Sequence, residues 1–333
     1  MASVDKQYLY SVGRVKELEK GLLSEANLDR VLEAEDPLAV LRSVGFFTTT
    51  EDHEQPESLE TLFLRERQQN RHQLHELIAD SPLEDIFLLP HDIENIKLLL
   101  KGKVTGNPAV KDLALEEGKF SKDELVAAIY DDMPTRLPPA IREEIASITT
   151  SFQDTQRLAD VDVQLERRLR LVQLELARTA GNRFLIEYLQ RLSDLQNIST
   201  TLRRKWHNLD RETLMSRLLD TGTIAPSFFD RLYDGGWESV AAALKPTPYG
   251  AVVAQAILEV NQNTFLSTLD VLCARYLIEF LETTKQITFG IEPIIAFYLA
   301  WDNALKMIRT ILVGKRFGYT QDQLHRHMRK LYA

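Results

Sequence analysis

The sequence has 333 residues, enough for two or three domains that each bury an apolar core. Aspartate and glutamate outnumber lysine and arginine by 49 to 40, so the chain lacks the overall positive field with which general nucleic-acid binders hold phosphate backbones. Its single cysteine, Cys273, excludes an internal disulfide and is typical of a reducing compartment. We therefore expect no nucleic-acid partner.

No segment of the chain predicts export or membrane insertion. Residues Met1–Tyr10 lack the basic-then-apolar order of a secretory signal. The most apolar stretches, 251–260 and 294–301, are shorter than the roughly 20 residues that cross a bilayer. If the protein works at a membrane, we expect it to dock from outside.

Apolar residues recur at spacings of three and four along almost the whole chain, and strand signals are sparse, which predicts an all-α fold. One long amphipathic helix is predicted over Asp154–Ala180, with Gly181 as its stop. Breakers separate the other predicted helices; these are Gly102, Gly106–Pro108, Met133-Pro134, Pro138–Pro139, Gly235–Gly236 and Pro246–Gly250.

A repeated segment indicates how the helices are organised. Asp92–Lys103 aligns without gaps on Asp194–Lys205, and Ala304–Lys315 keeps the isoleucine, the apolar stripe, the glycine and the final lysine. The starts of these segments lie 102 and 110 residues apart.

A second marker, a glycine-led turn followed by a helix start, occurs at Gly21, Gly118 and Gly222, which lie 97 and 104 residues apart. The two markers together predict three similar helical domains of about 100 residues. The predicted bounds are 1–110, 111–212 and 213–333.

The polar residues of the repeat are interpreted as residues that hold the fold. Asp92 and Asp194 are predicted to lie at helix starts, where a carboxylate caps free amides. Asn95 and Asn197, one turn later, are predicted to hydrogen-bond to a neighbouring helix.

Basic residues close each repeat and are the candidate interface of the protein. Cations at a helix C-terminus also complement the helix dipole, so a purely structural role stays open beside the interface role. The candidates are Lys101, Lys103, Arg203, Arg204, Lys205, Lys315 and Arg316.

The sequence contains no recognisable catalytic, cofactor-binding or metal-binding motif. The pairs Gly102-Lys103, Gly118-Lys119 and Gly314-Lys315 lack the earlier glycine and the following hydroxyl residue of a phosphate-binding loop. The histidine groups lack the His-Glu-x-x-His spacing and are interpreted as solvated side chains. They are His72 with His75-Glu76, and His325 with His327.

These segments resemble the C-type subunits of the archaeal and bacterial A/V-type ATPases, which are similar to the d-type subunit of the eukaryotic vacuolar enzyme. The resemblance runs from Tyr10–Leu23 to Phe289–Tyr298 and Ile308-Arg309, and it is most specific over 92–103, 222–249 and 289–315. The third repeat departs from the family pattern at Asp302–Leu305 and Met307, which puts its local contacts in doubt.

The resemblance implies three similar helical domains in a pseudo-threefold, funnel-like arrangement. It also implies a non-catalytic central-stalk connector that seats the shaft on the proteolipid ring and transmits torque for ATP-coupled proton or sodium transport. The implied partners are the D- and F-type shaft subunits and the membrane c-ring. The protein would be peripheral at the cytoplasmic face and contact the membrane only through the ring, with no cofactor.

Two other classes of protein remain as alternatives. A helical-repeat protein-binding scaffold unrelated to ATPases would show a shorter repeat of about 20 to 50 residues. A helical metal-dependent enzyme would depend on the histidines alone.

Overall fold

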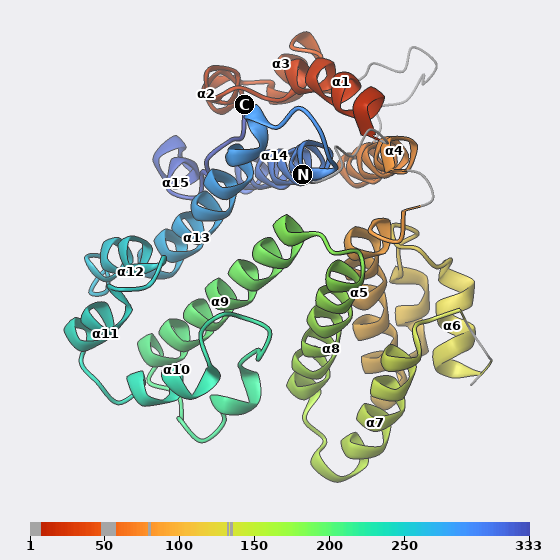
Figure 1. The fold of residues 1–333 in the computed structure, drawn as a ribbon, viewed down its shortest axis with the longest axis vertical. Coiled ribbons are helices and arrows are strands. Elements are labelled where there is room, and N and C mark those ends of the chain that lie inside the picture. The colour runs from red at the N-terminus through yellow and green to blue at the C-terminus, as the bar shows by residue number, and fades with distance from the viewer. Residues whose placement is uncertain (1–7, 48–57, 79–80, 132, 134–135) are drawn as a thin grey trace. The chain divides into compact units, whose positions relative to one another are not determined.

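The computed structural model describes residues 8–47, 58–78, 81–131, 133 and 136–333, which are helical or irregular and contain no strand (Figure 1). The all-α prediction is confirmed over these residues. Most of the Met1–Tyr10 segment lies outside them. None of the described helices is both long and apolar enough to cross a membrane.

The chain forms two compact units. The terminal unit combines residues 1–80 with 232–333, and the central unit contains residues 81–231. The predicted three-domain bounds differ from this division and remain a prediction.

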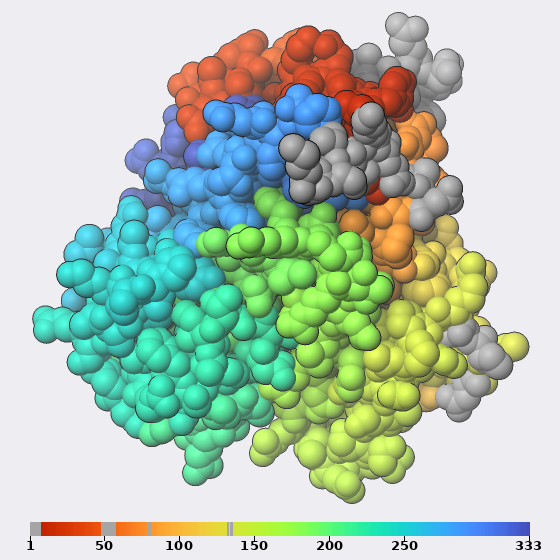
Figure 2. Space-filling view, viewed as in Figure 1, coloured from red at the N-terminus to blue at the C-terminus, as the bar shows by residue number. Residues whose placement is uncertain are grey.

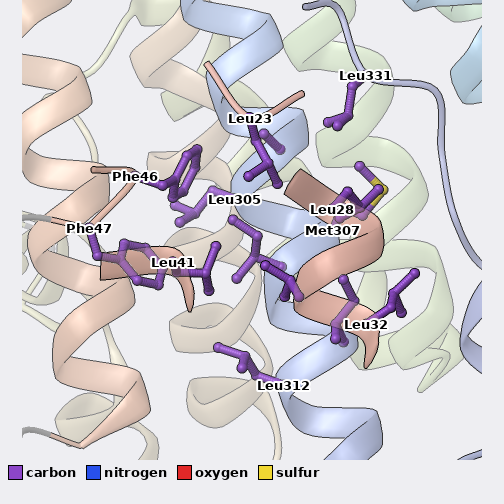
Figure 3. Packing of buried hydrophobic residues seen from close by; sticks show 14 of the residues in the cluster. Leu23, Leu28, Leu32, Leu41, Phe46, Phe47, Leu305, Met307, Leu312 and Leu331 are labelled. Atoms are coloured by element: carbon purple, nitrogen blue, oxygen red, sulfur yellow. The ribbon is translucent and has the colours of Figure 1, made fainter. Parts of the chain in front are cut away.

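The terminal unit brings together segments from both ends of the sequence. Its buried residues from Leu23 to Phe63 share one apolar cluster with those from Ala304 to Leu331 (Figure 3). Phe46 stacks on Trp301 with ring centroids 5.7 Å apart. The helices of this unit are α1 Leu9–Leu18, α2 Glu25–Glu33, α3 Pro37–Ser43, α4 Leu59–Ile78, α11 Trp237–Leu244, α12 Gly250–Ile257, α13 Phe265–Glu282, α14 Glu292–Arg316 and α15 Gln321–His325.

The central unit is built around α5, which packs against α8, α6 and α7. Ile93, Ile96 and Leu100 of α5 are fully buried in one cluster with Leu165 of α8 and Ile141 of α7. In the face that Figure 2 shows, side chains cover the ribbons of this unit. Its helices are α5 Glu84–Val104, α6 Lys122–Tyr130, α7 Pro139–Thr155, α8 Leu158–Thr179, α9 Arg183–Trp206 and α10 Pro226–Leu232, the last of which ends at the boundary of the unit.

The glycine-led turns lead into helices as predicted. Ser24 caps α2 by accepting from the Asn27 amide, and Ser121 forms a reciprocal capping box with Glu124 at the start of α6. The third turn leads into α10, which begins at Pro226. The predicted apolar residues that follow are all buried; they are Leu28, Leu125 and Phe229.

The predicted long helix corresponds to α8, with a later start. Asp154 and Thr155 belong to α7, which ends where Gln156 adopts a left-handed conformation with φ of 50°. The chain then turns and α8 begins at Leu158. Its end is as predicted, because Gly181 takes a φ of +64° just beyond the last turn.

Candidate interface at the ends of the repeat helices

The three repeated segments form the C-terminal halves of α5, α9 and α14, and all three helices end in the same way. In each, the amide two residues beyond the cap residue bonds to the carbonyl five residues earlier, and the intervening residue has a positive φ. This pattern is the Schellman motif. The bonds are Asn107 N to Gly102 O at 2.8 Å, Leu209 N to Arg204 O at 2.9 Å and Tyr319 N to Gly314 O at 2.9 Å.

The left-handed positions of these caps are Gly106, Asn208 and Gly318, and each lies at the same place in the alignment of the three segments. The same motif also ends α3 and α8, with Gly45 and Gly181 at the left-handed position, so the repeats share it but it is not specific to them. The three repeat helices, whose ends lie about a hundred residues apart, thus have the same cap geometry.

Most of the basic candidates bond to neighbouring parts of their own unit. Lys101 Nζ lies 2.5 Å from a carboxylate oxygen of Asp162 in α8, and Arg203 Nε donates to Ser199 Oγ at 3.0 Å. Arg204 donates to the carbonyl of Asp210 and to the hydroxyl of Thr213 in the following loop, both at 2.5 Å. These contacts support the structural explanation for these three side chains.

Two of the lysines tie the end of a repeat helix to the end of a short helix. Lys103 donates to the carbonyl of Ile129 in α6, and Lys315 donates to the carbonyl of Ala34 just after α2, at 2.6 Å. The terminal carbonyls of a helix have no partner within it, so the lysine satisfies one of them. Lys205, the third aligned lysine, is half-buried at the end of α9.

Arg316 differs from the other candidates. Its side chain is exposed at the end of α14 and forms no ion pair or hydrogen bond with the residues that the structure describes. Among the seven candidates it is the one exposed side chain.

Asp92 and Asp194 do not lie at helix starts, so that prediction is wrong. Both are fully buried in the middle of α5 and α9, which begin at Glu84 and Arg183. Each carboxylate caps free amides, but those amides belong to the glycine-led turn that comes later in the chain. Buried carboxylates need such charge-assisted bonds to offset the loss of hydration.

The Asp92 carboxylate accepts from the amides of Lys119 at 2.9 Å and Phe120 at 3.2 Å. Gly118 allows this approach, because a Cβ at that position would lie 1.9 Å from Asp92 Oδ1. Only a residue without a side chain fits between the turn and the carboxylate. The turn that contains Gly118 approaches α5 so closely that this position requires glycine.

Asp194 repeats this geometry with Gly222. Its carboxylate accepts from the amides of Thr223 and Ile224, each at 3.0 Å, and a Cβ on Gly222 would lie 2.1 Å from Oδ1. The Thr223 hydroxyl adds a third bond at 2.5 Å.

The two asparagines hold the same loops one turn further along. Asn95 donates to the carbonyl of Leu115 at 2.6 Å and accepts from its amide at 3.0 Å. Asn197 bonds in the same two ways to Leu219, at 2.8 and 2.7 Å. The partners are loop residues rather than a neighbouring helix, and the bonds support the interpretation that these asparagines hold the fold.

The third repeat has neither the aspartate nor the asparagine, and other contacts hold the neighbouring segment. Ala304 and Met307 occupy the aligned aspartate and asparagine positions, and both are buried. The Met307 sulfur accepts from the amide of Arg329 at 3.2 Å, and Asn303 donates to the carbonyl of Lys330 at 3.2 Å. The segment near the C-terminal end thus takes the place that a loop occupies beside α5 and α9.

A hollow of about 280 Å³ lies in the central unit beside a cluster of charged side chains. Glu166 accepts from Lys97 at 3.1 Å and from Arg170 at 2.8 Å. Burial alone would raise the pKa of Glu166, but Arg170 and Lys97 outweigh it and hold this pKa below its usual value. Burial alone would lower the pKa of Lys97, but Glu166 and Glu94 outweigh it, so this pKa lies above its usual value.

The charged side chains that line this hollow carry both signs, and each has an ion-pair partner: Lys97 pairs with Glu166, Asp162 with Lys101 and Arg217 with Asp160. This arrangement favours a structural ion-pair network over a site for a charged ligand. The residues that line it are Lys97, Asp162, Val163, Glu166, Gln196, Thr200, Arg217 and Leu219.

The histidine groups lie at the surface. His72 Nε2 is 3.2 Å from Glu76 Oε1 one turn later, and both side chains are solvent-accessible. His325 and His327 are exposed near the end of the chain. Among the described residues, no three histidine, cysteine, aspartate or glutamate side chains group closely enough to hold a metal ion.

These contacts define a class of protein: an all-helical chain with an internal repeat, whose recurring polar residues bond to its own backbone. A family described as ATP synthase (C/AC39) subunit matches residues 11–327, and the chain belongs to this family. It is therefore a non-catalytic subunit of an A/V-type ATPase complex. This membership excludes a scaffold unrelated to ATPases.

Two characterised relatives are similar over most of the chain. The C-type subunit of the V-type sodium ATPase of Enterococcus hirae is 26% identical over 268 residues, which cover 79% of this chain and 81% of the relative. The C-type subunit of the A-type ATP synthase of Methanocaldococcus jannaschii is 24% identical over 250 residues, which cover 69% of this chain and 61% of the relative.

Proposed function

We propose that this protein is the central-stalk connector of a rotary A/V-type ATPase. It seats the central shaft on the proteolipid ring and transmits torque between ATP hydrolysis or synthesis and the transport of protons or sodium. The observation that carries the proposal is the family match over residues 11–327, which spans nearly the whole chain. The partners are the D- and F-type shaft subunits and the ring, at the cytoplasmic face of the membrane.

The contacts described above suit a part that bears load. A torque-transmitting protein must deform little, and close-packed helices have low compressibility. Lys103 and Lys315 join the ends of helices that sequence separates, and the buried carboxylates of Asp92 and Asp194 fix loops against helices. These bonds oppose sliding of one element past another.

The repeat also supports three similar domains in a pseudo-threefold, funnel-like arrangement. In two of the three repeats, a lysine at the end of the repeat helix bonds to the end of a short helix. In both cases this short helix directly follows a glycine-led turn. For α5 this helix is α6, and for α14 it is α2, near the other end of the chain. A funnel of three such domains would grip a cylindrical shaft on several sides.

Binding to the shaft tests the proposal. The purified chain is mixed with the two shaft subunits encoded in the same genome, and co-elution and affinity are followed at low and moderate salt. We expect a stoichiometric complex and no ATP turnover by this chain alone. Absence of binding to both the shaft and the detergent-solubilised ring at every salt concentration would refute it.

A further inference from the structure

The end of α14 carries an exposed aromatic side chain, Phe317, that its cap does not require. Thr105 and His207 occupy the cap position of α5 and α9, and Phe317 occupies it in α14 with 75% of its surface exposed. Two residues later, Tyr319 is 52% exposed. Since threonine and histidine close the same cap, the fold gives no reason for an exposed phenylalanine here.

The turn that carries these side chains is held firmly. Gly318 has a φ of +77° in the Schellman motif, and a Cβ on Gly314 would lie 2.5 Å from Leu324 and 3.4 Å from the Tyr319 ring. Tyr319 and Leu324 therefore pack over Gly314, which fixes the turn and α15 against the end of α14. Thr320 then caps α15 in a reciprocal box with Gln323.

Two exposed arginines flank the aromatic side chains in the sequence. Arg316 precedes Phe317, Arg326 follows α15, and both are exposed. Neither forms an ion pair with any residue in the described part of the chain. Because the whole chain has a formal charge of −9, this is a local reversal of sign.

We propose that Arg316, Phe317, Tyr319 and Arg326, called here the aromatic tip, form a docking surface for an acidic polypeptide surface of a partner protein in the ATPase. This inference rests on the proposed function, which it deepens by naming a contact surface. Arginine and aromatic side chains are enriched among the residues that dominate protein interfaces. The arginines require carboxylates on the partner, and Phe317 requires an apolar site between them.

A polypeptide partner fits better than an anionic bilayer. α15 packs on α2, whose Glu25, Asp29 and Glu33 are exposed. A flat anionic surface brought to the tip would also approach these carboxylates within about the 8 to 10 Å over which charges interact at physiological salt. A shaped protein surface can place its carboxylates at the arginines alone.

The test uses two variants, Phe317→Ala with Tyr319→Ala, and Arg316→Glu with Arg326→Glu. Two matched controls are Leu209→Ala, at the position of Tyr319 in the α9 cap, and Arg178→Glu, an exposed arginine near the end of α8. Each full-length protein is titrated with the two shaft subunits, with the detergent-solubilised ring, and with vesicles of phosphatidylcholine containing phosphatidylglycerol. Melting temperatures verify that all variants are folded.

We expect both tip variants to bind either the shaft or the ring about tenfold more weakly or worse, while both controls bind like the wild type. Binding of the wild type to one partner with unchanged binding of the tip variants to both would overturn this inference and leave the proposed function intact. Loss of vesicle binding alone would make the tip a membrane site and also overturn it. Failure of the wild type to bind shaft and ring would refute the proposed function and this inference with it.

Discussion

Replacing Gly118 by alanine tests the buried carboxylate clamp most sharply. The added Cβ would lie 1.9 Å from Asp92 Oδ1, so the carboxylate or the turn must shift and the bonds to the amides of Lys119 and Phe120 are weakened. A hydrogen bond to a charged group contributes about 1.5 to 3 kcal/mol, and part of each bond survives relaxation of the turn. We expect the free energy of unfolding to fall by about 3 kcal/mol.

For a cooperative unit of this size, 1 kcal/mol corresponds to about 2 to 4 °C in melting temperature, so we expect a decrease of about 6 to 12 °C. The matched control is Gly21→Ala, at the aligned position of the terminal unit, where no atom lies within 4 Å of the added Cβ. This control should change stability by less than about 0.5 kcal/mol. Thermal and urea unfolding followed by circular dichroism measure both; equal losses in the two variants, or none in Gly118→Ala, would refute the clamp.

Three further substitutions probe the other contacts. Asn95→Leu should lower the melting temperature by several degrees and leave affinity for the shaft unchanged, because the buried Asn95 amide holds the backbone of Leu115; an affinity loss at unchanged melting temperature would overturn this role. Glu166→Gln should cost about 3 kcal/mol at neutral pH, because Lys97 and Arg170 both lose this carboxylate and Lys97 keeps only Glu94. The folded-state pKa of Glu166 is lowered, so its contribution is present above the unfolded pKa and is lost as the pH falls through the folded pKa; urea unfolding from pH 7 to 3 should show the wild type and the variant converging in acid. Lys315→Met should cost about 1 kcal/mol through its bond to a helix-end carbonyl and Arg316→Ala less than about 0.5 kcal/mol, and the reverse order in urea unfolding would contradict the roles assigned to them.

The sequence predicted the features that depend on local patterns. Helix periodicity placed α8 and its end at Gly181, and the cap residues Ser24 and Ser121 placed the starts of α2 and α6. It also placed Leu28 and Leu125 on buried faces. These features are decided by residues within one or two helical turns, so the sequence alone contains their cause.

Contacts between distant segments were not predicted. Asp92 was assigned to a helix start because its partner amides lie 27 and 28 residues further along the chain. A signal existed in the nearly constant interval from aspartate to glycine, since Gly118 follows Asp92 by 26 residues and Gly222 follows Asp194 by 28. That interval marks a tertiary contact, whereas a cap acts over three residues.

The candidate interface was predicted by residue type but not by role. Lys103, Arg204 and Lys315 are basic residues at helix ends, as expected, and their side chains bond within the protein. The partner of Lys315 in α14 could not be predicted from nearby sequence, because Ala34 lies 281 residues earlier in the chain. Arg316 differs from the other six candidates because its side chain is exposed. Exposure depends on tertiary packing, which helical periodicity in the sequence does not describe.

Reconstitution of the ATPase with and without this chain tests the central claim most directly. The complex is assembled in sealed vesicles, and ATP hydrolysis and ATP-driven ion uptake are measured side by side. If the chain connects shaft and ring, its omission leaves hydrolysis running and abolishes ion uptake, and adding the purified chain restores uptake. Undiminished ATP-driven uptake in its absence would contradict the account.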